Sequence, residues 1–142
     1  MADAETEADR WWWWVMEDAA DAETRLFDLI NRARVARRLS ALIRDDTVDR
    51  VARDYADKSL QTGVIAHIGP QGEGPGDRLR GAGVAGARIT ENLARNSTVE
   101  GAHLSLMRSL GHRKNILDPE VDRIGIGVAT EPPLIDGIQE RE

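Results

Sequence analysis

Residues 109–117 read SLGHRKNIL, and this stretch decides how the rest of the chain is interpreted. A segment with helical spacing of leucines runs into it, Gly111 interrupts that spacing, and His112, Arg113 and Asn115 follow. Two interpretations stay open from these residues alone. The cations complement the negative end of a helix, or the histidine is half of an active site built on irregular backbone. The rest of the sequence has to separate them.

The bulk composition is that of one globular domain. The chain has 142 residues, of which 41% are hydrophobic and 31% charged. Its 19 basic and 25 acidic residues give a net charge of −6, which argues against a nucleic-acid partner. Cysteine is absent, so disulfides and thiolate metal ligands are excluded. No stretch approaches the ~20 apolar residues of a membrane span, and we expect a monomer.

The N-terminal residues 1–20 differ from the rest of the chain. The acidic segment MADAETEADR precedes the run Trp11–Trp14. A secretory signal begins with basic residues and has a longer apolar core, so no export signal is visible. We interpret residues 1–20 as an acidic, tryptophan-rich extension that is poorly ordered or loosely docked, and residues 21–142 as the folded domain. An aromatic anchor for a membrane or a partner is the alternative.

The spacing of apolar residues predicts three amphipathic helices. The second takes Asp46 as its N-cap and stops at Gly63, and the third opens with a capping box of Ser97 and Glu100. Gly111 closes the third helix, which leaves the following histidine just beyond its end. The predicted helices cover residues 20–36, 48–60 and 97–111.

Loops and short strands are predicted between these helices. A loop rich in glycine and proline covers residues 66–76, and a single helical turn follows at 77–80. Residues 87–94 are partly alternating and predict a strand, and residues 123–129 predict a second one that two prolines end. Helices interleaved with a few strands indicate an α/β (α+β) arrangement in layers around one core.

Three polar residues stand out as candidates for chemistry. His67 heads the glycine-rich loop, His112 follows the third helix, and Glu91 lies in the strand-like segment. A carboxylate there needs a partner, such as a histidine, an arginine or a metal. Two imidazoles and one carboxylate form a known zinc site and equally a general acid–base pair. The alternatives are a loop-capping role for His67 and a surface position for Glu91.

His103 is set aside from this candidate site. It falls on the apolar stripe of the third helix, with Val99 and Leu106. A histidine in that position is better explained as a core-edge residue that is hydrogen-bonded to the backbone.

The order of the segments resembles the CAP superfamily (cysteine-rich secretory proteins, antigen 5, pathogenesis-related 1). The likeness is to its cysteine-free bacterial branch, the SCP-like extracellular domains, and it spans about residues 22–130. The motifs in the right order are far more specific together than any one of them. They are Leu29-Ile30-Asn31 with Arg34; Leu39, Leu42 and Asp45 followed by Val48, Ala52 and Tyr55; AHIGPQG at 66–72 with Pro75, Arg78 and Leu79; ENLA at 91–94; SLGHRKNIL at 109–117; and IGIGVA at 124–129.

The resemblance implies a three-layer α-β-α sandwich with an antiparallel-rich central sheet and a central cavity. The family places two histidines and acidic residues there, which correspond to His67, Glu91 and His112. Such a cavity takes zinc or another divalent ion, and lipid, peptide and cell-envelope ligands are all compatible with it. Family members are not reliably enzymes. The resemblance also implies an extracellular or cell-envelope location. Arg78, with Arg113 and Asn115, is expected to support the loop and the cavity rim.

Several positions depart from the family pattern. Near Ser109 the second acidic residue of the cavity is missing, so the expected set is a triad. The aromatic-rich last strand is not evident after Pro133, and residues 134–138 are at most a shortened substitute. The other departures are Gln71, Thr90, Leu106 and Leu110, which stand where the family has aspartate, glycine, tryptophan and proline.

The leading hypothesis is therefore a binding domain whose cavity holds a divalent ion and presents a groove to a ligand or an envelope partner. The second is a hydrolase of the peptidase type, in which a metal-bound water or a His/Glu pair attacks the substrate. The third is an interaction module in which the triad is a hydrogen-bonded remnant.

Overall fold

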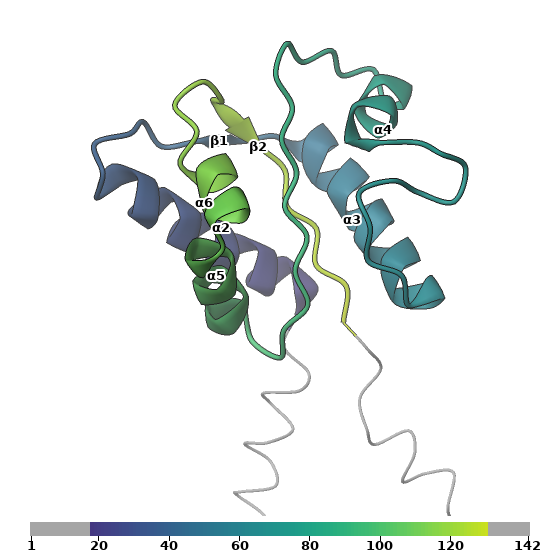
Figure 1. The fold of residues 1–142 in the computed structure, drawn as a ribbon, viewed down its shortest axis with the longest axis horizontal. Coiled ribbons are helices and arrows are strands. Elements are labelled where there is room, and N and C mark those ends of the chain that lie inside the picture. Colours follow the sequence, from purple (N-terminus) through teal and green to yellow (C-terminus); the bar gives the residue numbers. More distant parts are fainter. Residues whose placement is uncertain (1–17, 131–142) are drawn as a thin grey trace, which may run out of the picture.

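The computed structural model describes residues 18–130, and in this part of the chain five helices and two short strands form. Helices α2, α5 and α6 gather on one side of a middle layer of extended chain, and α3 and α4 lie on the other side (Figure 1). Helices thus lie on both sides of a middle layer, as expected, but that layer is mostly extended chain and not a sheet. The bounds are α2 Ala19–Val35, β1 Ile43–Arg44, α3 Asp46–Thr62, α4 Pro75–Gly81, α5 Val99–Arg108, α6 Leu110–Ile116 and β2 Arg123–Ile124.

Some of the sequence-based expectations concern residues outside the described range. These are the interpretation of the tryptophan run Trp11–Trp14, the two prolines that end the last strand, and the shortened strand at 134–138.

Helix α2 is fastened at its C-terminal end by a buried arginine. The Arg34 guanidinium donates hydrogen bonds to the backbone oxygens of Ser40 (2.8 Å), Ile116 (2.8 Å) and Asp118 (2.9 Å). Burial lowers the pKa of Arg34, and the negative charge of Asp118 partly offsets that effect. This side chain therefore joins the end of α2 to the end of α6.

The N-cap of helix α3 lies one residue before the predicted one. Asp45 is the N-cap, not Asp46, and its carboxylate accepts hydrogen bonds from the N–H groups of Thr47 (2.9 Å) and Val48 (3.1 Å). Asp45 has extended backbone because its own N–H pairs with Ile124, directly after β1. A cap needs such non-helical backbone, which Asp46 no longer has. The predicted stop is confirmed, since the residue after Thr62 is a glycine at φ +73°.

The sheet differs from the expected antiparallel-rich one. β1 and β2 pair in parallel, with Ile43 opposite Arg123 and Arg44 opposite Ile124, and the described residues form no other ladder. The strand predicted over 123–129 therefore ends early. Beyond Ile124 its N–H groups find side-chain acceptors in place of a neighbouring strand.

Glu23 and Asp49 supply those acceptors. Ile126 donates its N–H to Asp49 (2.8 Å), and Val128 donates to Glu23 (3.1 Å). The Glu23 side chain is 0% exposed and also receives hydrogen bonds from Arg53 (2.6 and 2.9 Å). Two carboxylates thus hold the extended segment between the helical layers, where a ladder would have held it.

The segment 87–94 is not a strand, contrary to the prediction. It runs as irregular extended chain past the middle layer (Figure 1). Side chains of other elements take up its polar groups, because Asn115 donates to the Glu91 backbone oxygen (3.2 Å) and Arg88 donates to Asp118 (2.6 Å). Alternation identified an extended segment correctly, but it did not show that a pairing partner was missing.

The third predicted helix is two helices with a break at Ser109. Ser109 has extended backbone (φ −93°, ψ 122°), and α6 starts at the next residue and runs through Gly111. The prediction that Gly111 ends the helix is therefore wrong. The N-cap of α5 is Thr98 and not Ser97, because the Thr98 hydroxyl accepts the hydrogen bond from the Gly101 N–H (2.9 Å).

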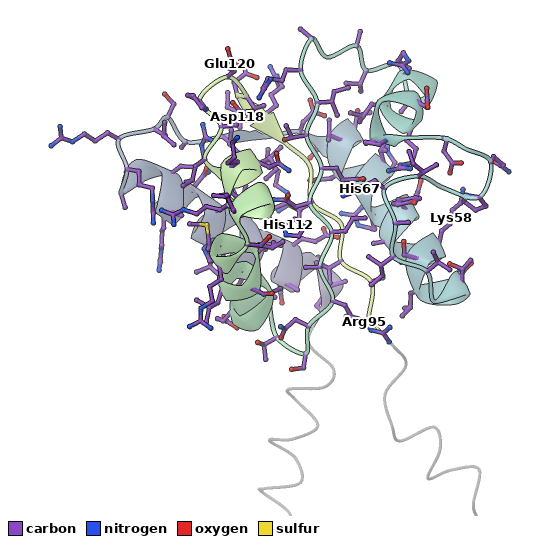
Figure 2. The ribbon with its side chains drawn as sticks, in the orientation of Figure 1. Lys58, His67, Arg95, His112, Asp118 and Glu120 are labelled. Atoms are coloured by element: carbon purple, nitrogen blue, oxygen red, sulfur yellow. The ribbon has the colours of Figure 1, made fainter. Side chains whose placement is uncertain are left out.

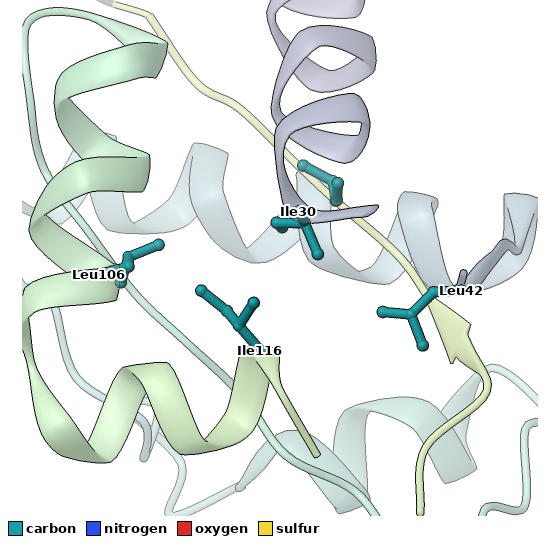
Figure 3. Close-up of a cluster of buried hydrophobic side chains, with 5 residues drawn as sticks. Ile30, Leu42, Leu106 and Ile116 are labelled. Atoms are coloured by element: carbon teal, nitrogen blue, oxygen red, sulfur yellow. The ribbon is translucent and has the colours of Figure 1, made fainter. Parts of the chain in front are cut away.

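The apolar core lies between α2, α5, α6 and the extended segment after β2. Figure 3 shows Ile30, Leu42, Leu106 and Ile116 pointing toward one another, and Ile126 completes the cluster of buried side chains. Because both α5 and α6 contribute to it, the core fixes the orientation of α6. It thereby also fixes the position of His112, which α6 carries.

Candidate functional site

His67 and Glu91 form the centre of the candidate site. His67 lies in the loop after α3, and its Nδ1 is 2.8 Å from Glu91 Oε1. The other carboxylate oxygen, Oε2, accepts a hydrogen bond of 2.8 Å from Arg78 Nη2. Glu91 is therefore paired on both oxygens, which meets the need of a carboxylate in this half-buried position.

Arg78 of α4 holds this loop in place. Its guanidinium also donates to the backbone oxygens of His67 (3.2 Å) and Glu73 (3.3 Å) and lies 3.5 Å from the centroid of the Tyr55 ring. The Tyr55 hydroxyl in turn donates to the Ala66 backbone oxygen at 2.5 Å. Helices α3 and α4 thus fix the backbone on both sides of the imidazole, and the supporting role expected for Arg78 matches these contacts.

His112 reaches the same region from α6. Its Nδ1 is 3.0 Å from the hydroxyl of Ser109, and its backbone oxygen accepts a hydrogen bond from Asn92 (3.1 Å). Asn115 donates to the side-chain oxygen of Asn92 (2.9 Å) as well as to the backbone of Glu91. The dipeptide Glu91-Asn92 therefore contacts His67 on one side and the helix of His112 on the other.

The three predicted site residues are not all brought into direct contact. Figure 2 shows both histidines near the middle of the molecule, His67 on the α3 side and His112 on α6. His67 bonds directly to Glu91, whereas the link from His112 runs through Asn92. Among residues 18–130, no group of three carboxylate or imidazole side chains is arranged to hold a metal ion.

The ring nitrogens of the two histidines have comparable surroundings. A carboxylate only accepts hydrogen bonds, so the Nδ1 of His67 carries the proton in the contact with Glu91. A neutral His67 then has a free lone pair on Nε2, and its side chain is 53% exposed. In His112, Nδ1 is likewise the atom engaged, here with the Ser109 hydroxyl. His67 therefore has its Nε2 available for a ligand. The Ser109 hydroxyl both donates and accepts, so its contact is compatible with either tautomer of His112, and the tautomer with the proton on Nδ1 also leaves Nε2 available.

Two hollows of the described residues lie away from the candidate site. One shallow hollow lies on α3 and includes Thr47 and Arg50, and another lies on α2 and includes Asn31 and Val35. None of the three predicted site residues lines either hollow. In the described part of the chain, the site pairs an exposed histidine with a half-buried carboxylate.

His103 lies apart from the site, as expected, but its surroundings differ from the prediction. Its Nδ1 is buried and has no hydrogen-bond partner within residues 18–130, so the expected bond to the backbone is wrong. Burial lowers the pKa of His103, and the positive charge of Arg37 lowers it further. The helical stripe correctly predicted partial burial but could not show what the ring nitrogen faces.

The sequence interpretation missed two residues, Asn92 and Ser109. The contacts of Asn92 could have been inferred, because successive side chains in extended chain point to opposite sides. With Glu91 directed to the loop of His67, Asn92 is directed to α6. The sequence interpretation considered Ser109 only as a position that lacks an acidic residue. The contact of its hydroxyl with His112 depends on a helix break at Ser109, whereas the sequence had placed that break at Gly111.

Comparison with known proteins shows which family the chain belongs to. The model of the cysteine-rich secretory protein family, CAP, matches residues 27–136. The chain belongs to the CAP family. The resemblance drawn from the motifs is thereby confirmed, and the α+β CAP fold with it.

Two bacterial proteins illustrate what this CAP domain is similar to. The uncharacterised protein YkwD of Bacillus subtilis is 31% identical over 106 residues, which are 74% of this chain and 41% of YkwD. A crystal structure of an extracellular protein containing an SCP domain from Bacillus anthracis has a TM-score of 0.76 and 28% identity, covering 81% of this chain and 39% of that one.

A more distant likeness concerns the fold alone. An outer surface protein of Borrelia burgdorferi has a TM-score of 0.64 at 24% identity, covering 76% of this chain and 80% of that protein. The CAP domain spans less than half the length of YkwD and of the Bacillus anthracis protein. Within residues 18–130, no helix has the length and apolar character needed to cross a membrane.

Proposed function

We propose that this CAP domain is a binding domain of the extracellular space or the cell envelope, and that it holds a divalent ion such as zinc at His67 and His112. The observation that carries the proposal is the 2.8 Å contact between His67 Nδ1 and Glu91. Metal-binding histidines commonly donate their other ring N–H to a carboxylate, which fixes the tautomer and raises the basicity of the ligating nitrogen.

The donor set suits an open site. Two imidazole nitrogens are ligands that zinc accepts, and the remaining coordination positions would be taken by water or by atoms of a ligand. Glu91 orients His67 and does not itself ligate in this arrangement, because Arg78 already neutralises its second oxygen. A bound ion would act as a Lewis acid that polarises an oxygen atom of the ligand.

The location and the partner class are part of the same proposal. The Bacillus anthracis neighbour is described as extracellular and the Borrelia neighbour as an outer surface protein. A CAP domain with such neighbours fits a ligand from the same environment, for example a lipid, a peptide or a component of the cell envelope.

Isothermal titration of the full chain with zinc tests the metal site. We expect saturable binding at one site, and we expect His67→Ala and His112→Ala each to abolish it. His103→Gln is the matched control, since it removes an imidazole that lies apart from the site. Circular dichroism establishes that every variant is folded. The proposal fails if zinc does not bind above background, or if the two alanine variants bind as the parent does.

The same histidine–carboxylate contact favours a second candidate, a hydrolase. With Glu91 holding the Nδ1 proton, His67 Nε2 can accept a proton from an attacking water as a general base. Hydrolysis of a peptide library would then fall about 100-fold or more in Glu91→Gln, which keeps the shape of the side chain but weakens the orientation of the imidazole. The control is Asp77→Asn, an exposed carboxylate of α4. Equal rates in the parent and in Glu91→Gln would contradict this candidate.

A further inference from the structure

Two large apolar side chains are exposed where α5 meets α6. Leu104 on α5 is 50% exposed, and Leu110, the first residue of α6, is 77% exposed. They lie on either side of the break at Ser109. Neither belongs to the buried core cluster, to which these helices contribute Leu106 and Ile116. Scattered single leucines are ordinary on a protein surface, but the surroundings of these two share a pattern.

Each exposed leucine has a cation four residues further on. Arg108 follows Leu104, and Lys114 follows Leu110. Residues four apart lie one turn apart on the same face of a helix, so both exposed faces carry one leucine and one cation. Arg113 lies three residues after Leu110 and adds a third cation on that side of α6.

These three cations have no partners in the described part of the chain. No ion pair or side-chain hydrogen bond joins Arg108, Arg113 or Lys114 to another residue within 18–130, whereas Arg44, Arg53 and other arginines of the same chain are paired. These positive side chains lie in the last turns of α5 and α6, where they interact favourably with the negative end of the helix dipole. That helix-dipole role explains the cations, but it does not explain why the leucines beside them are exposed.

Acidic side chains do not cancel this charge. Glu100 lies one turn before Leu104 on α5, and it is bound to Arg25 of α2 at 2.7 Å. Helix α6 carries no acidic residue. Asp118, which follows α6, is buried and paired with Arg88 at 2.6 Å. Within α5 and α6, three cations therefore lie beside the two leucines, and Glu100 is the one acidic residue of these helices, on a chain with a net charge of −6.

We propose that the α5–α6 surface, defined as Leu104, Arg108, Leu110, Arg113 and Lys114, docks on anionic lipid bilayers. Apolar side chains ringed by lysine and arginine are typical of interfacial binding, in which the apolar groups reach the acyl boundary and the cations meet the headgroups. Such docking is reversible and peripheral. It does not depend on the proposed metal site, because it uses none of the three residues His67, Glu91 and His112.

Co-sedimentation of the full chain with lipid vesicles tests the proposal. We expect binding to vesicles of phosphatidylcholine with added phosphatidylglycerol, and much weaker binding to phosphatidylcholine alone. Lys114→Ala should lower the partition coefficient about fivefold, the effect of losing one cation near an anionic surface. Leu110→Ser should lower it about tenfold, because the serine leaves no apolar side chain to bury.

Matched controls separate this surface from the rest of the molecule. Arg50→Ala removes an exposed cation of α3, and Val64→Ser removes an exposed apolar residue after α3. Both should bind anionic vesicles as the parent does. Circular dichroism shows that all variants are folded.

The proposal is overturned by equal binding to both vesicle types, by no binding to either, or by a Leu110→Ser variant that binds like the parent. The last result would mean that charge alone holds the chain to the vesicle. Failure of zinc binding would leave these outcomes unchanged, so the two proposals are tested separately.

Discussion

At the scale of single residues, Arg78 does more to shape the candidate site than either histidine. Its guanidinium joins the Glu91 carboxylate to two backbone oxygens and lies against the face of Tyr55. The side chain is only 10% exposed, so these hydrogen bonds form largely out of water. The planar fork of arginine reaches all of these acceptors at once, whereas the single ammonium group of lysine cannot.

Arg78→Lys should therefore destabilise the fold although it keeps the charge. We expect the free energy of unfolding to fall by about 1–3 kcal/mol, because the loop oxygens and Glu91 lose partners. Denaturation by urea measures this change. Arg80→Lys is the control, since Arg80 forms an exposed pair with Asp77 and should cost about 0–1 kcal/mol. Equal losses in the two variants would show that Arg78 has no special role.

His103 makes a pH-dependent contribution. Burial and the charge of Arg37 lower its pKa, so the folded chain binds this proton less readily than the unfolded chain does. The unfolded state then gains protons first as the pH falls below about 6.5, and the free energy of unfolding decreases until the folded-state pKa is passed. We expect His103→Leu to remove this decrease. Urea denaturation at a series of pH values is the measurement.

The test at His103 is the slope of the free energy of unfolding against pH. If the parent and His103→Leu lose stability equally between neutral pH and about pH 5, the protonation of another group is responsible. The control is Val64→Ser, an exposed substitution that removes no titratable group and should leave that slope in place.

At the scale of elements, the break between α5 and α6 shows what local residue preferences can and cannot predict. Glycine is the usual residue at the end of a helix, which is why Gly111 was expected to close the third one. The chain breaks two residues earlier, at the extended Ser109, and the two helices on either side of the break place Leu106 and Ile116 in one core. Tertiary packing has overridden the local signal.

Gly111→Ala discriminates between the two descriptions of this segment. In the structure Gly111 lies inside α6 and an added Cβ meets nothing within 4 Å. Alanine should therefore stabilise the fold by about 0.5–1 kcal/mol in urea denaturation. Gly63→Ala is the matched control, since it also has open space but sits at φ +73° and should destabilise. Destabilisation by Gly111→Ala would mean that the chain turns at Gly111 after all.

At the scale of the whole molecule, the sequence predicted those features that depend on short-range spacing. Helices α2 and α3 follow from apolar periodicity, and the stop after Thr62 follows from one glycine. The sheet was not predictable in this way. The groups that pair with Ile126 and Val128 are carboxylates that lie 77 and 105 residues away in the chain. No local pattern indicates such long-range acceptors.

The candidate site shows the same limit. Polar residue type and the order of the motifs singled out His67, Glu91 and His112. Spacing could not show that Arg78 takes one oxygen of Glu91, or that Asn92 is the link to the helix of His112. Both contacts cross between elements, so they depend on how the helices pack. A sequence motif can therefore identify the site residues, but it cannot predict the contacts that side chains from other elements make with them.

The buried carboxylate of Glu23 connects the two helical layers to the middle layer, so it should control how the whole molecule unfolds in acid. Burial raises its pKa, but the hydrogen bonds from Arg53 and Val128 and the charges of Arg53 and Arg44 outweigh that effect and lower it overall. The charged form is therefore stabilised by folding. This stability is present above the usual glutamate range near pH 4.5 and is lost as the pH falls through the lowered value.

Glu23→Gln should cost about 3 kcal/mol at neutral pH, because Arg53 and Arg44 lose their buried counter-charge. The variant should also lose less of its remaining stability than the parent does below about pH 4. Thermal or urea denaturation across the acid range measures both effects, with Asp57→Asn as a control that removes an exposed carboxylate of α3. If Glu23→Gln unfolds in acid with the same pH dependence as the parent, the layers are held together by the apolar core alone. The carboxylate would then serve only to place the backbone of Val128. A loss at neutral pH together with a flattened acid limb would show that the ionised Glu23, together with Asp49, holds this middle layer in place of a sheet ladder.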